Sequence, residues 1–376
     1  MKIVVLGAGR VGAAMVQDLA GQADLDVTVA DVSDAALGRL AGVGAVKADL
    51  SRPEEVERIA AAHDLAVGAV PGPMGFATAR AVIDAGTPLV DISFFEEDAF
   101  ALDALAREKG VPALVDCGVA PGLSNLILGH LESTLESIDS FACYVGGLPV
   151  ERRAPYEYKA PFSPIDVLAE YTRPVRLREH GRTVQRPALG RPERLDIDGV
   201  GTLEAFETDG LRTLMLTSQV PNLIEKTLRY PGHRQLMEVF RDSGFLSEET
   251  VTLADGTEVR PVDLTAHLLF PRWKLRDGEE ELTAMRLVTT GVENGRAIRI
   301  TYDLLDRTDA ATGTTSMART TGYTCTAMVR LVVDGLWRRP GVSPPEIVGR
   351  EAECHSRVIE YLAQRGVVLR QRAETL

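Results

Sequence analysis

The sequence predicts an α/β protein: a doubly wound parallel sheet completed by C-terminal helices, with an inserted α+β domain built on a mixed or antiparallel sheet. Apolar strands and amphipathic helices alternate through the first 136 residues, which is typical of a parallel sheet. From residue 138 the pattern becomes β-rich, and helical spacing returns after residue 317. We therefore expect one domain over 1–136 plus 317–376 and a second domain over 137–316.

Length and charge limit the class of protein. A chain of 376 residues is longer than a single hydrophobic core usually serves, which agrees with two domains. The formal net charge of −13 repels phosphate backbones, so we expect no nucleic-acid partner. The opening MKIVVLGAG holds too short an apolar run for a signal peptide or a membrane span, and we expect no membrane association.

The cysteines and histidines form no recognisable metal or disulfide pattern. Four cysteines lie far apart without a CxxC pair, and six histidines show neither HxH nor HExxH spacing. The sequence therefore predicts no metal site and favours a reducing, cytoplasmic location.

The first strand, turn and helix carry a dinucleotide-binding fingerprint. A β-branched strand at 2–6 precedes GAGRVG, and an apolar-periodic helix begins near Arg10. In such a Rossmann turn the first glycine permits the tight bend, the second lets backbone approach a pyrophosphate, and the third permits close helix packing. The expected phosphate contacts are Gly7, Gly9, Arg10, Val11 and Gly12.

The second strand, LDVTVAD, ends in Asp31. A carboxylate at this place accepts hydrogen bonds from a ribose 2′-hydroxyl and repels a 2′-phosphate. The residues directly after it, Val32 to Asp34, supply no arginine. We therefore predict NAD rather than NADP as the cofactor.

The alternation then continues to a sixth strand. The expected elements are strand 45–48, helix 53–62, strand 65–70, helix 74–85, strand 88–92, helix 97–109 and strand 111–116. Because ligands bind beyond the carboxyl ends of parallel strands, residues that follow the strands are expected to contact the cofactor. These residues are Asp49, Val70, Pro71, Asp91 and Gly118.

The sixth strand leads into VDCGVAPGLSNLILGH, a Gly/Pro turn followed by a helix. Cys117 has no neighbouring histidine in sequence to activate it, so we interpret it as a small apolar filler rather than a nucleophile.

The second domain shows strand patterns in SIDSFACYVGGL, PVRLREHGRTVQ and TLEAFETDG. Two alternating strands flank Asn294–Gly295, the preferred pair for a tight hairpin turn. Further on, we expect a helix within 317–338, a loop bounded by Pro340 and Pro345, and a last helix in REAECHSRVIEYLAQRGV.

Several motifs together resemble the saccharopine dehydrogenase family. They are the glycine fingerprint, DCGVAPGLSN, YKAPFSPIDVLAEYTRPVRL, GVGTLEAF and EKTLRYPGH. DISFFEED and SMARTTGYTCTA look like the branch that acts on lysine, the lysine 6-dehydrogenase branch. The resemblance implies a homodimer formed through the inserted domain. It also implies NAD-dependent oxidation of lysine at its ε-carbon, release of ammonia, and cyclisation of the 6-semialdehyde.

Two alternatives remain open. One is a reductive condensation of an amine with an aldehyde, as in saccharopine or carboxynorspermidine formation. It requires additional cations for a second carboxylate, and Arg152, Arg153 and Arg173 are available in sequence. The other is a dinucleotide-sensing protein that keeps the fold without catalysis.

Oxidation of an amine requires a base, because hydride leaves the carbon only when the nitrogen is neutral. Asp116, at the end of the sixth strand, is our first candidate, and a role in holding the following turn is an equal alternative. Weaker candidates are Asp91, Lys159 and His233.

Recognition of a lysine-like amino acid requires a cation for its carboxylate. Arg229 is our choice, because a guanidinium fork suits a carboxylate, with a structural ion pair as the alternative. Arg319 could serve instead. The neighbouring residues expected at a substrate are Thr227, Tyr230, Thr320 and Thr321, with Phe94, Glu96 and Glu97 after the fifth strand.

Overall fold

The structure is a computed structural model that describes residues 1–160, 164–276 and 278–376. The chain divides into two compact units, and each is described by itself. Unit 1 consists of Met1–Glu136, Leu216–Ser218 and Ala318–Val368. Unit 2 consists of Ser137–Met215, Gln219–Met317 and Leu369–Leu376.

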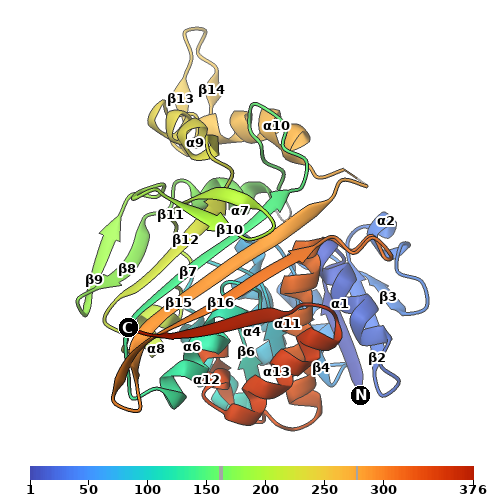
Figure 1. Cartoon of the computed structure of the whole chain (residues 1–376). Coiled ribbons are helices and arrows are strands. Elements are labelled where there is room, and N and C mark those ends of the chain that lie inside the picture. Colours follow the sequence, from blue (N-terminus) through green and yellow to red (C-terminus); the bar gives the residue numbers. More distant parts are fainter. Residues whose placement is uncertain (161–163, 277) are drawn as a thin grey trace. The chain divides into compact units, whose positions relative to one another are not determined.

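Unit 1 is built on a parallel sheet with seven strands among the described residues, in the order β17-β6-β5-β4-β1-β2-β3 (Figure 1). The order reverses between β1 and β4, which is the switch point of a doubly wound sheet. The predicted fold class is confirmed. The strands are β1 (Lys2–Leu6), β2 (Asp26–Asp31), β3 (Gly44–Lys47), β4 (Leu65–Gly68), β5 (Leu89–Asp91), β6 (Pro112–Leu114) and β17 (Gly341–Ser343).

The segments between these strands form helices, because their apolar residues recur with helical spacing. Val56, Ile59 and Ala60, for example, form the buried face of α3. The helices are α1 (Arg10–Ala20), α2 (Asp34–Leu37), α3 (Pro53–Ala60), α4 (Gly72–Asp84), the 3₁₀ turn η1 (Ala99–Leu102), α5 (Asp103–Lys109), α6 (Leu123–Thr134), α11 (Ser316–Val333), α12 (Pro345–Gly349) and α13 (Ala352–Gln364).

The seventh strand corrects one prediction. The segment between Pro340 and Pro345 was expected to be a loop, but Gly341–Ser343 pairs in parallel with Pro112–Leu114 of β6. All three residues of this strand are buried. A three-residue strand between prolines has too few positions to show a pattern, so its pairing depends on tertiary contacts that the local sequence does not reveal.

Unit 2 is built on a nine-stranded mixed sheet among the described residues (Figure 1). The hairpin predicted at Asn294–Gly295 joins its two long strands, β15 and β16. One parallel pair, β12 with β7, makes the sheet mixed. The strands are β7 (Ser137–Pro149), β8 (Val175–Glu179), β9 (Arg182–Arg186), β10 (Glu193–Ile197), β11 (Gly201–Glu207), β12 (Leu223–Arg229), β15 (Glu281–Glu293), β16 (Arg296–Arg307) and β18 (Leu369–Thr375).

Helices and a small hairpin complete unit 2. They are α7 (Pro164–Glu170), α8 (Leu214–Thr217), whose residues from Leu216 onward lie in unit 1, α9 (His233–Asp242), β13 (Val251–Thr252), β14 (Glu258–Val259) and α10 (Pro261–Trp273). Residues 161–163 of the family-like element YKAPFSPIDVLAEYTRPVRL lie outside the described residues.

The last strand changes the expected domain boundaries. The prediction assigns 317–376 to the first domain, whereas Leu369–Leu376 belongs to unit 2. There β18 pairs antiparallel with β16, from Leu369 opposite Leu304 to Thr375 opposite Ile298. Its sequence LRQRAET is almost wholly exposed, so it lacks the apolar alternation that identifies a strand from sequence.

Candidate functional site

The glycine turn of unit 1 has the close packing that its sequence predicts. Gly7 has φ of +115°, and a Cβ there would lie 2.5 Å from the carbonyl oxygen of Ala69. A Cβ on Gly12 would lie 2.0 Å from the carbonyl oxygen of Gly7. Both positions therefore require glycine: a side chain on Gly7 would collide with the chain after β4, and one on Gly12 would separate α1 from the turn.

Gly9 differs from these two glycines. Its φ is −65°, it is the N-cap residue of α1, and a Cβ there would meet no protein atom within 4 Å. No side chain caps this helix N-terminus. Backbone N–H groups at the positive end of a helix bind phosphates, so the turn fits the pyrophosphate of a dinucleotide beside Gly9, Arg10 and Val11.

Asp31 is tied to the same turn. One carboxylate oxygen accepts a hydrogen bond from the Ala8 N–H at 2.7 Å, and the other accepts one from the Ser33 N–H at 2.8 Å. Asp31 is half-buried at the end of β2, so it brings a negative charge next to the glycine turn. This is where the sequence analysis expected a ribose contact.

The other strand-end residues have different surroundings. Val70 is buried and Pro71 is exposed as the N-cap of α4. Asp49 is exposed, and its carboxylate accepts from the backbone and hydroxyl of Ser51. The Ser51 hydrogen bonds lower the pKa of Asp49. It therefore holds the turn that leads to α3.

Asp91 is fully buried at the end of β5. Its two carboxylate oxygens accept from the N–H and hydroxyl of Ser93 at 2.9 and 3.0 Å. A Cβ on Gly68 would lie 1.8 Å from one of these oxygens. The carboxylate therefore packs against β4 and holds the turn after β5. Phe94 is half-buried in this turn, and Glu96 and Glu97 are exposed.

Asp116 begins the turn after β6. It is 2% exposed and has φ of +57°, in the left-handed region that aspartate tolerates better than most residues. The turn closes on itself, since the Leu123 N–H donates to the Gly118 carbonyl oxygen at 2.9 Å. At Gly122, with φ of +138°, a Cβ would lie 1.8 Å from that same oxygen. The backbone thus presents Asp116 at a fixed place beyond the strand end.

Cys117 is fully buried beside Asp116, as the filler interpretation expects. Its thiol lies 3.5 Å from the Val115 carbonyl oxygen. Burial raises the pKa of the Cys117 thiol well above its usual value. A thiol that resists deprotonation is a poor nucleophile.

Helix α11 borders both turns of unit 1. A Cβ on Gly322 would lie 3.5 Å from the Val11 carbonyl oxygen, and a Cβ on Gly118 would lie 3.4 Å from the Thr321 methyl group. Thr320, one residue earlier, is fully buried. The glycine turn, the Asp116 turn and the predicted residues Thr320 and Thr321 thus form one contiguous region.

Arg319 has a different position from its two threonine neighbours. Its guanidinium donates to the Arg365 carbonyl oxygen at 2.9 Å, and its central carbon lies 5.6 Å from the centre of the Tyr323 ring. These contacts hold the Arg319 side chain against the end of α13.

In unit 2, a buried polar cluster surrounds Arg229, the last residue of β12. We name it the Arg229 cluster; its members are Tyr158, Tyr171, Arg229, His233 and Trp273. The Arg229 guanidinium donates to Tyr171 Oη at 3.3 Å, to the Leu228 carbonyl oxygen at 3.0 Å and to Glu170 at 3.0 Å. Arg229 is 3% exposed, and burial raises the pKa of Glu170 although Arg229 opposes this.

Hydrogen bonds in the Arg229 cluster fix the state of His233. Its Nδ1 lies 2.8 Å from the Tyr156 carbonyl oxygen, which can only accept, so Nδ1 carries the proton. Its Nε2 then accepts from the Tyr171 hydroxyl at 2.9 Å. Burial, together with the charge of Arg229, lowers the pKa of His233 to about 3. With both nitrogens engaged, His233 is suited to orienting Tyr171 rather than to accepting a proton from substrate.

The side chains of Lys159 and Tyr230 have partners outside this cluster. The Lys159 ammonium donates to the Arg272 carbonyl oxygen at 3.0 Å and pairs with Glu279 at 3.6 Å. Tyr230 follows Arg229 in the chain, so it faces the other side of the sheet, where its hydroxyl donates to the Pro149 carbonyl oxygen at 3.0 Å. Thr227 shares the face of Arg229 and hydrogen-bonds to Thr208.

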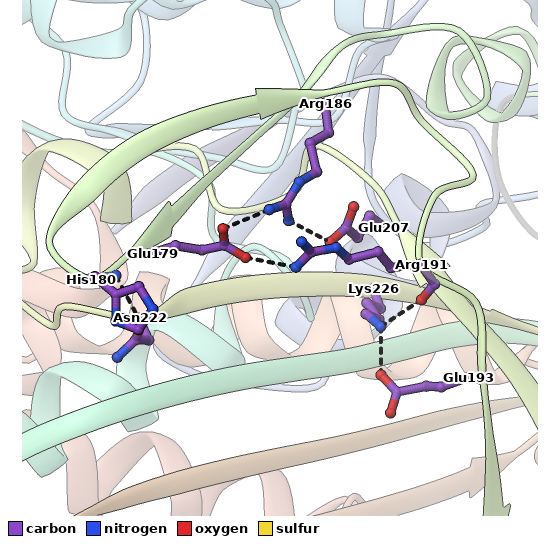
Figure 2. Close-up of polar contacts among 8 residues, drawn as sticks. All are labelled: Glu179, His180, Arg186, Arg191, Glu193, Glu207, Asn222 and Lys226. Atoms are coloured by element: carbon purple, nitrogen blue, oxygen red, sulfur yellow. Dashed lines mark hydrogen bonds and ion pairs between the residues drawn. The ribbon is translucent and has the colours of Figure 1, made fainter.

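A second charged group lies on the opposite face of β11 and β12, and Figure 2 shows its contacts. We name it the Arg186 network; its members are Glu179, Arg186, Arg191, Glu193, Glu207 and Lys226. Arg186 bridges Glu179 at 2.6 Å and Glu207 at 3.1 Å. Arg191 also pairs with Glu179, and Lys226 pairs with Glu193. Each cation of this network thus has a carboxylate partner.

The described residues contain neither a metal-binding cluster nor a membrane-spanning helix. Among 1–160, 164–276 and 278–376, no group of three or more His, Cys, Asp or Glu side chains is arranged to hold a metal ion. Within the same ranges, no helix has both the length and the apolar character that crossing a membrane requires.

Comparison with known proteins identifies the family. Residues 3–114 match the family model described as the saccharopine dehydrogenase NADP binding domain, and residues 118–367 match the saccharopine dehydrogenase C-terminal domain. The chain belongs to the saccharopine dehydrogenase family. It carries both domains of the family, and the first of them binds a nicotinamide dinucleotide.

Individual relatives are more distant. The chain is 22% identical over 266 residues to the mitochondrial alpha-aminoadipic semialdehyde synthase of Rattus norvegicus, covering 66% of this chain and 29% of that protein. It is 24% identical over 273 residues to a Schizosaccharomyces pombe saccharopine dehydrogenase named as NADP(+)-dependent and L-glutamate-forming, covering 65% and 58%. The chain therefore spans less than two thirds of these relatives.

A solved structure supports the fold over the whole chain. Apo saccharopine dehydrogenase (L-Glu forming) from Saccharomyces cerevisiae superimposes with a TM-score of 0.81 at 18% identity, and covers 99% of both chains. At this identity the match establishes the fold of this family member.

Sequence reasoning missed three members of the Arg229 cluster, namely Tyr158, Tyr171 and Trp273. Tyr158 and Tyr171 lie within an element quoted for the resemblance, but no spacing links them to Arg229 or Trp273. Only the folded sheet brings residues from four segments together. No local sequence signal identifies them, because the contact between these aromatic residues and Arg229 exists only in the folded unit.

Proposed function

We propose that this protein is a nicotinamide-dinucleotide-dependent oxidoreductase that makes or breaks a C–N bond of a lysine-derived amino acid of the saccharopine type. The observation that carries the proposal is the match of the chain to both family domains, together with a glycine turn whose geometry fits a dinucleotide. Curated relatives are named for saccharopine, which supports this substrate class.

Two residues have proposed roles in this chemistry. When bound, the nicotinamide exchanges hydride with the carbon next to the amine nitrogen. Asp116 in unit 1 is the proposed proton acceptor for the amine, because it is a buried carboxyl held by a rigid turn. Arg229 in unit 2 is the proposed partner of a substrate carboxylate.

A specific observation favours a second candidate, oxidation of the ε-amine of L-lysine with release of ammonia. Saccharopine has more carboxylates than lysine and needs more cations. Arg152 pairs with Glu157, and Arg153 pairs with Glu151 and Glu279, so both are engaged by acids of the chain. Arg173, the third arginine, lies near Glu170 and Arg229, where burial raises the pKa of Glu170 and the charge of Arg173 opposes that rise. Because two of the three arginines are paired elsewhere, a substrate with one carboxylate is favoured.

Product analysis separates the two candidates. Purified protein is supplied with oxidised cofactor and either saccharopine or L-lysine, and reduced cofactor is followed by absorbance. The saccharopine proposal expects L-glutamate in proportion to reduced cofactor, and the lysine proposal expects ammonia. If neither saccharopine nor L-lysine leads to reduced cofactor between pH 7 and 10, both proposed reactions are rejected. A dinucleotide sensor would bind cofactor under these conditions without turnover.

The choice between NAD and NADP is a separate proposal. We propose NAD because Asp31 brings a carboxylate next to the glycine turn, although the family model and several relatives carry NADP in their names. Competition between NADH and NADPH for the protein tests this. Tighter binding of NADPH would overturn it, and Asp31→Ala should shift the ratio of affinities toward NADPH.

Location and assembly remain expectations from the sequence. We propose a cytoplasmic homodimer, on the basis of the cysteine pattern and the family resemblance. Sedimentation of the purified chain tests the dimer, and a monomer at micromolar concentration would reject it.

A further inference from the structure

The Arg229 cluster contains buried hydrogen-bond donors that the chain does not use. Among the described residues, Tyr158 Oη and Trp273 Nε1 are both buried without a hydrogen-bond partner. The exposed fractions are 3% for Tyr158 and 0% for Trp273. A buried polar group without a partner destabilises the folded state, so two such groups in one cluster require an explanation.

Arg229 adds further donors to the same place. A guanidinium has five N–H groups, and the three hydrogen bonds of Arg229 go to Tyr171, the Leu228 carbonyl oxygen and Glu170. One N–H on each terminal nitrogen is therefore left over. These two donors belong to a buried guanidinium, a group that binds carboxylates well.

The three side chains are in direct contact. The central carbon of the Arg229 guanidinium lies 4.6 Å from the centre of the Tyr158 ring. The Tyr158 and Trp273 rings meet edge to face, with centres 5.3 Å apart. A cation, a hydroxyl and an indole N–H thus belong to one set of contacting side chains.

Two other residues set the direction of the arginine. His233 accepts from the Tyr171 hydroxyl, which leaves the Tyr171 oxygen to accept from Arg229 Nε. This chain of hydrogen bonds holds the plane of the guanidinium. Glu170 pairs with Arg229 and its side chain is 28% exposed, so the cluster reaches the surface at this carboxylate.

We propose that Tyr158 and Trp273, together with Arg229, form the binding site for a carboxylate group of the ligand. The ligand is an amino acid, whose carboxylate accepts hydrogen bonds from the Tyr158 hydroxyl, the Trp273 indole and the free N–H groups of Arg229. An acceptor-only anion satisfies donors that water, which also donates, satisfies less completely. The inference rests on the proposed function for its substrate class and adds two binding residues to it.

Indole NMR signals test the site without turnover. The chain has two tryptophans, so protein labelled with ¹⁵N-tryptophan gives two indole N–H signals, which Trp337→Phe assigns. L-Norleucine serves as the probe because it has the backbone of lysine without the ε-amine. We expect it to move the Trp273 signal downfield in a saturable way, while L-norleucinamide, which lacks the carboxylate, does not. Equal responses to both probes, or a shift of neither signal, would overturn the proposal.

Tyr158→Phe removes the hydroxyl and keeps the ring. We expect it to weaken L-norleucine binding about tenfold or more, since it removes a hydrogen bond to a charged group. Without ligand, its unfolding midpoint in urea should stay the same or rise, because an unsatisfied buried hydroxyl is lost. Tyr156→Phe is the matched control: its ring also meets Trp273 edge to face, and only its backbone oxygen contacts His233.

The outcomes separate this inference from the proposed function. Binding of L-norleucine that depends on Tyr158, without turnover of saccharopine or lysine, would keep the carboxylate site and reject the proposed reaction. Turnover with an unchanged KM in Tyr158→Phe would reject the carboxylate site and keep the reaction. Reduced binding in both tyrosine variants would show a general packing effect and would also overturn the assignment.

Discussion

The two faces of β12 hold two groups of polar side chains. The groups differ in which buried atoms, donors or acceptors, lack a hydrogen-bond partner. In the Arg186 network, Arg186, Arg191 and Lys226 each pair with a carboxylate of the chain. In the Arg229 cluster, a hydroxyl and an indole N–H are buried without an acceptor among the described residues. In the described part of the chain, the unpartnered buried atom of the Arg186 network is an acceptor, Glu207 Oε2, whereas every cation of the network is paired, which indicates a structural role.

The same contrast exists within unit 1. Gly12 is closed in by backbone, whereas Gly9 faces space that no protein atom fills within 4 Å. The carboxylates of Asp91 and Asp49 accept hydrogen bonds from neighbouring serines, whereas no side chain caps the N-terminus of α1. We place ligands where the described part of the chain leaves hydrogen-bond donors without an acceptor or a side-chain cap.

The largest effect is expected at Arg229. Arg229→Gln leaves Glu170 without its cation and removes the donors for the carboxylate, so binding of L-norleucine should fall by at least about 100-fold. Breaking a buried ion pair from one side should also cost about 3–5 kcal/mol in free energy of unfolding. Urea unfolding and a binding titration measure these effects.

Arg186→Gln is the matched control for that variant. It removes the guanidinium that pairs with Glu207, whose side chain is fully buried, so a carboxylate loses its cation as in Arg229→Gln. We expect a loss of stability of similar size and unchanged binding of L-norleucine. Equal losses of binding in the two variants would remove the distinction between the two faces.

The next effect concerns Glu225, on the Arg229 side of β12. It accepts from the Thr208 hydroxyl at 2.7 Å, and burial, with Glu170 and Asp209 nearby, raises the pKa of Glu225 to about 8. A carboxyl whose pKa is raised on folding stabilises the protein below its unfolded pKa, near 4.5, and this stabilisation is lost as the pH rises toward 8.

Glu225→Gln should therefore flatten the pH dependence of unfolding between pH 5 and 8, by on the order of 2–3 kcal/mol. Urea titrations across this range measure the change. Glu193→Gln is the comparison, since Glu193 pairs with Lys226 in the Arg186 network. An unaltered pH profile in Glu225→Gln would show that Glu225 is ionised throughout the range.

A smaller effect separates the two glycines of the turn. Gly12→Ala should destabilise unit 1 by about 1–3 kcal/mol through overpacking, because its Cβ meets backbone. Gly9→Ala should leave stability unchanged and weaken dinucleotide binding about tenfold, because its Cβ fills the space proposed for phosphate. Full dinucleotide affinity in Gly9→Ala would move the phosphates elsewhere.

The smallest effect is expected at Cys117. Cys117→Ala removes a buried thiol next to Asp116 and should cost about 1 kcal/mol of stability while turnover stays within about twofold. Asp116→Asn, one residue away, should abolish turnover and preserve cofactor affinity. Loss of activity in the cysteine variant at full stability would give the thiol a catalytic role.

Local signals account for what the sequence predicted. The strand at 2–6, three glycines and an apolar-periodic helix are neighbours in the chain, so the dinucleotide turn is visible without tertiary information. The Asn294–Gly295 hairpin is equally local. The strands at Gly341–Ser343 and Leu369–Thr375 were missed because one is too short and the other too polar to show a pattern.

The Arg229 cluster could not be predicted for a different reason. Arg229 was identified as a carboxylate partner from its residue type, but Tyr158, Tyr171 and Trp273 come from separate segments that the sheet and helices of unit 2 bring together. His233 was a candidate base from its usual pKa near 6.5, and burial beside a guanidinium lowers that pKa to about 3. Residue type predicts chemistry only until the surroundings are known.

Hydrogen exchange with and without L-norleucine tests the central claim most directly. If pairs of buried donors without an acceptor mark the ligand site, the probe should slow amide exchange in the segments around Tyr158, Tyr171 and Trp273. Exchange in β9 and β10, which flank the Arg186 network, should remain the same. Protection in β9 and β10, or exchange that is unchanged everywhere at saturating probe, would contradict the account.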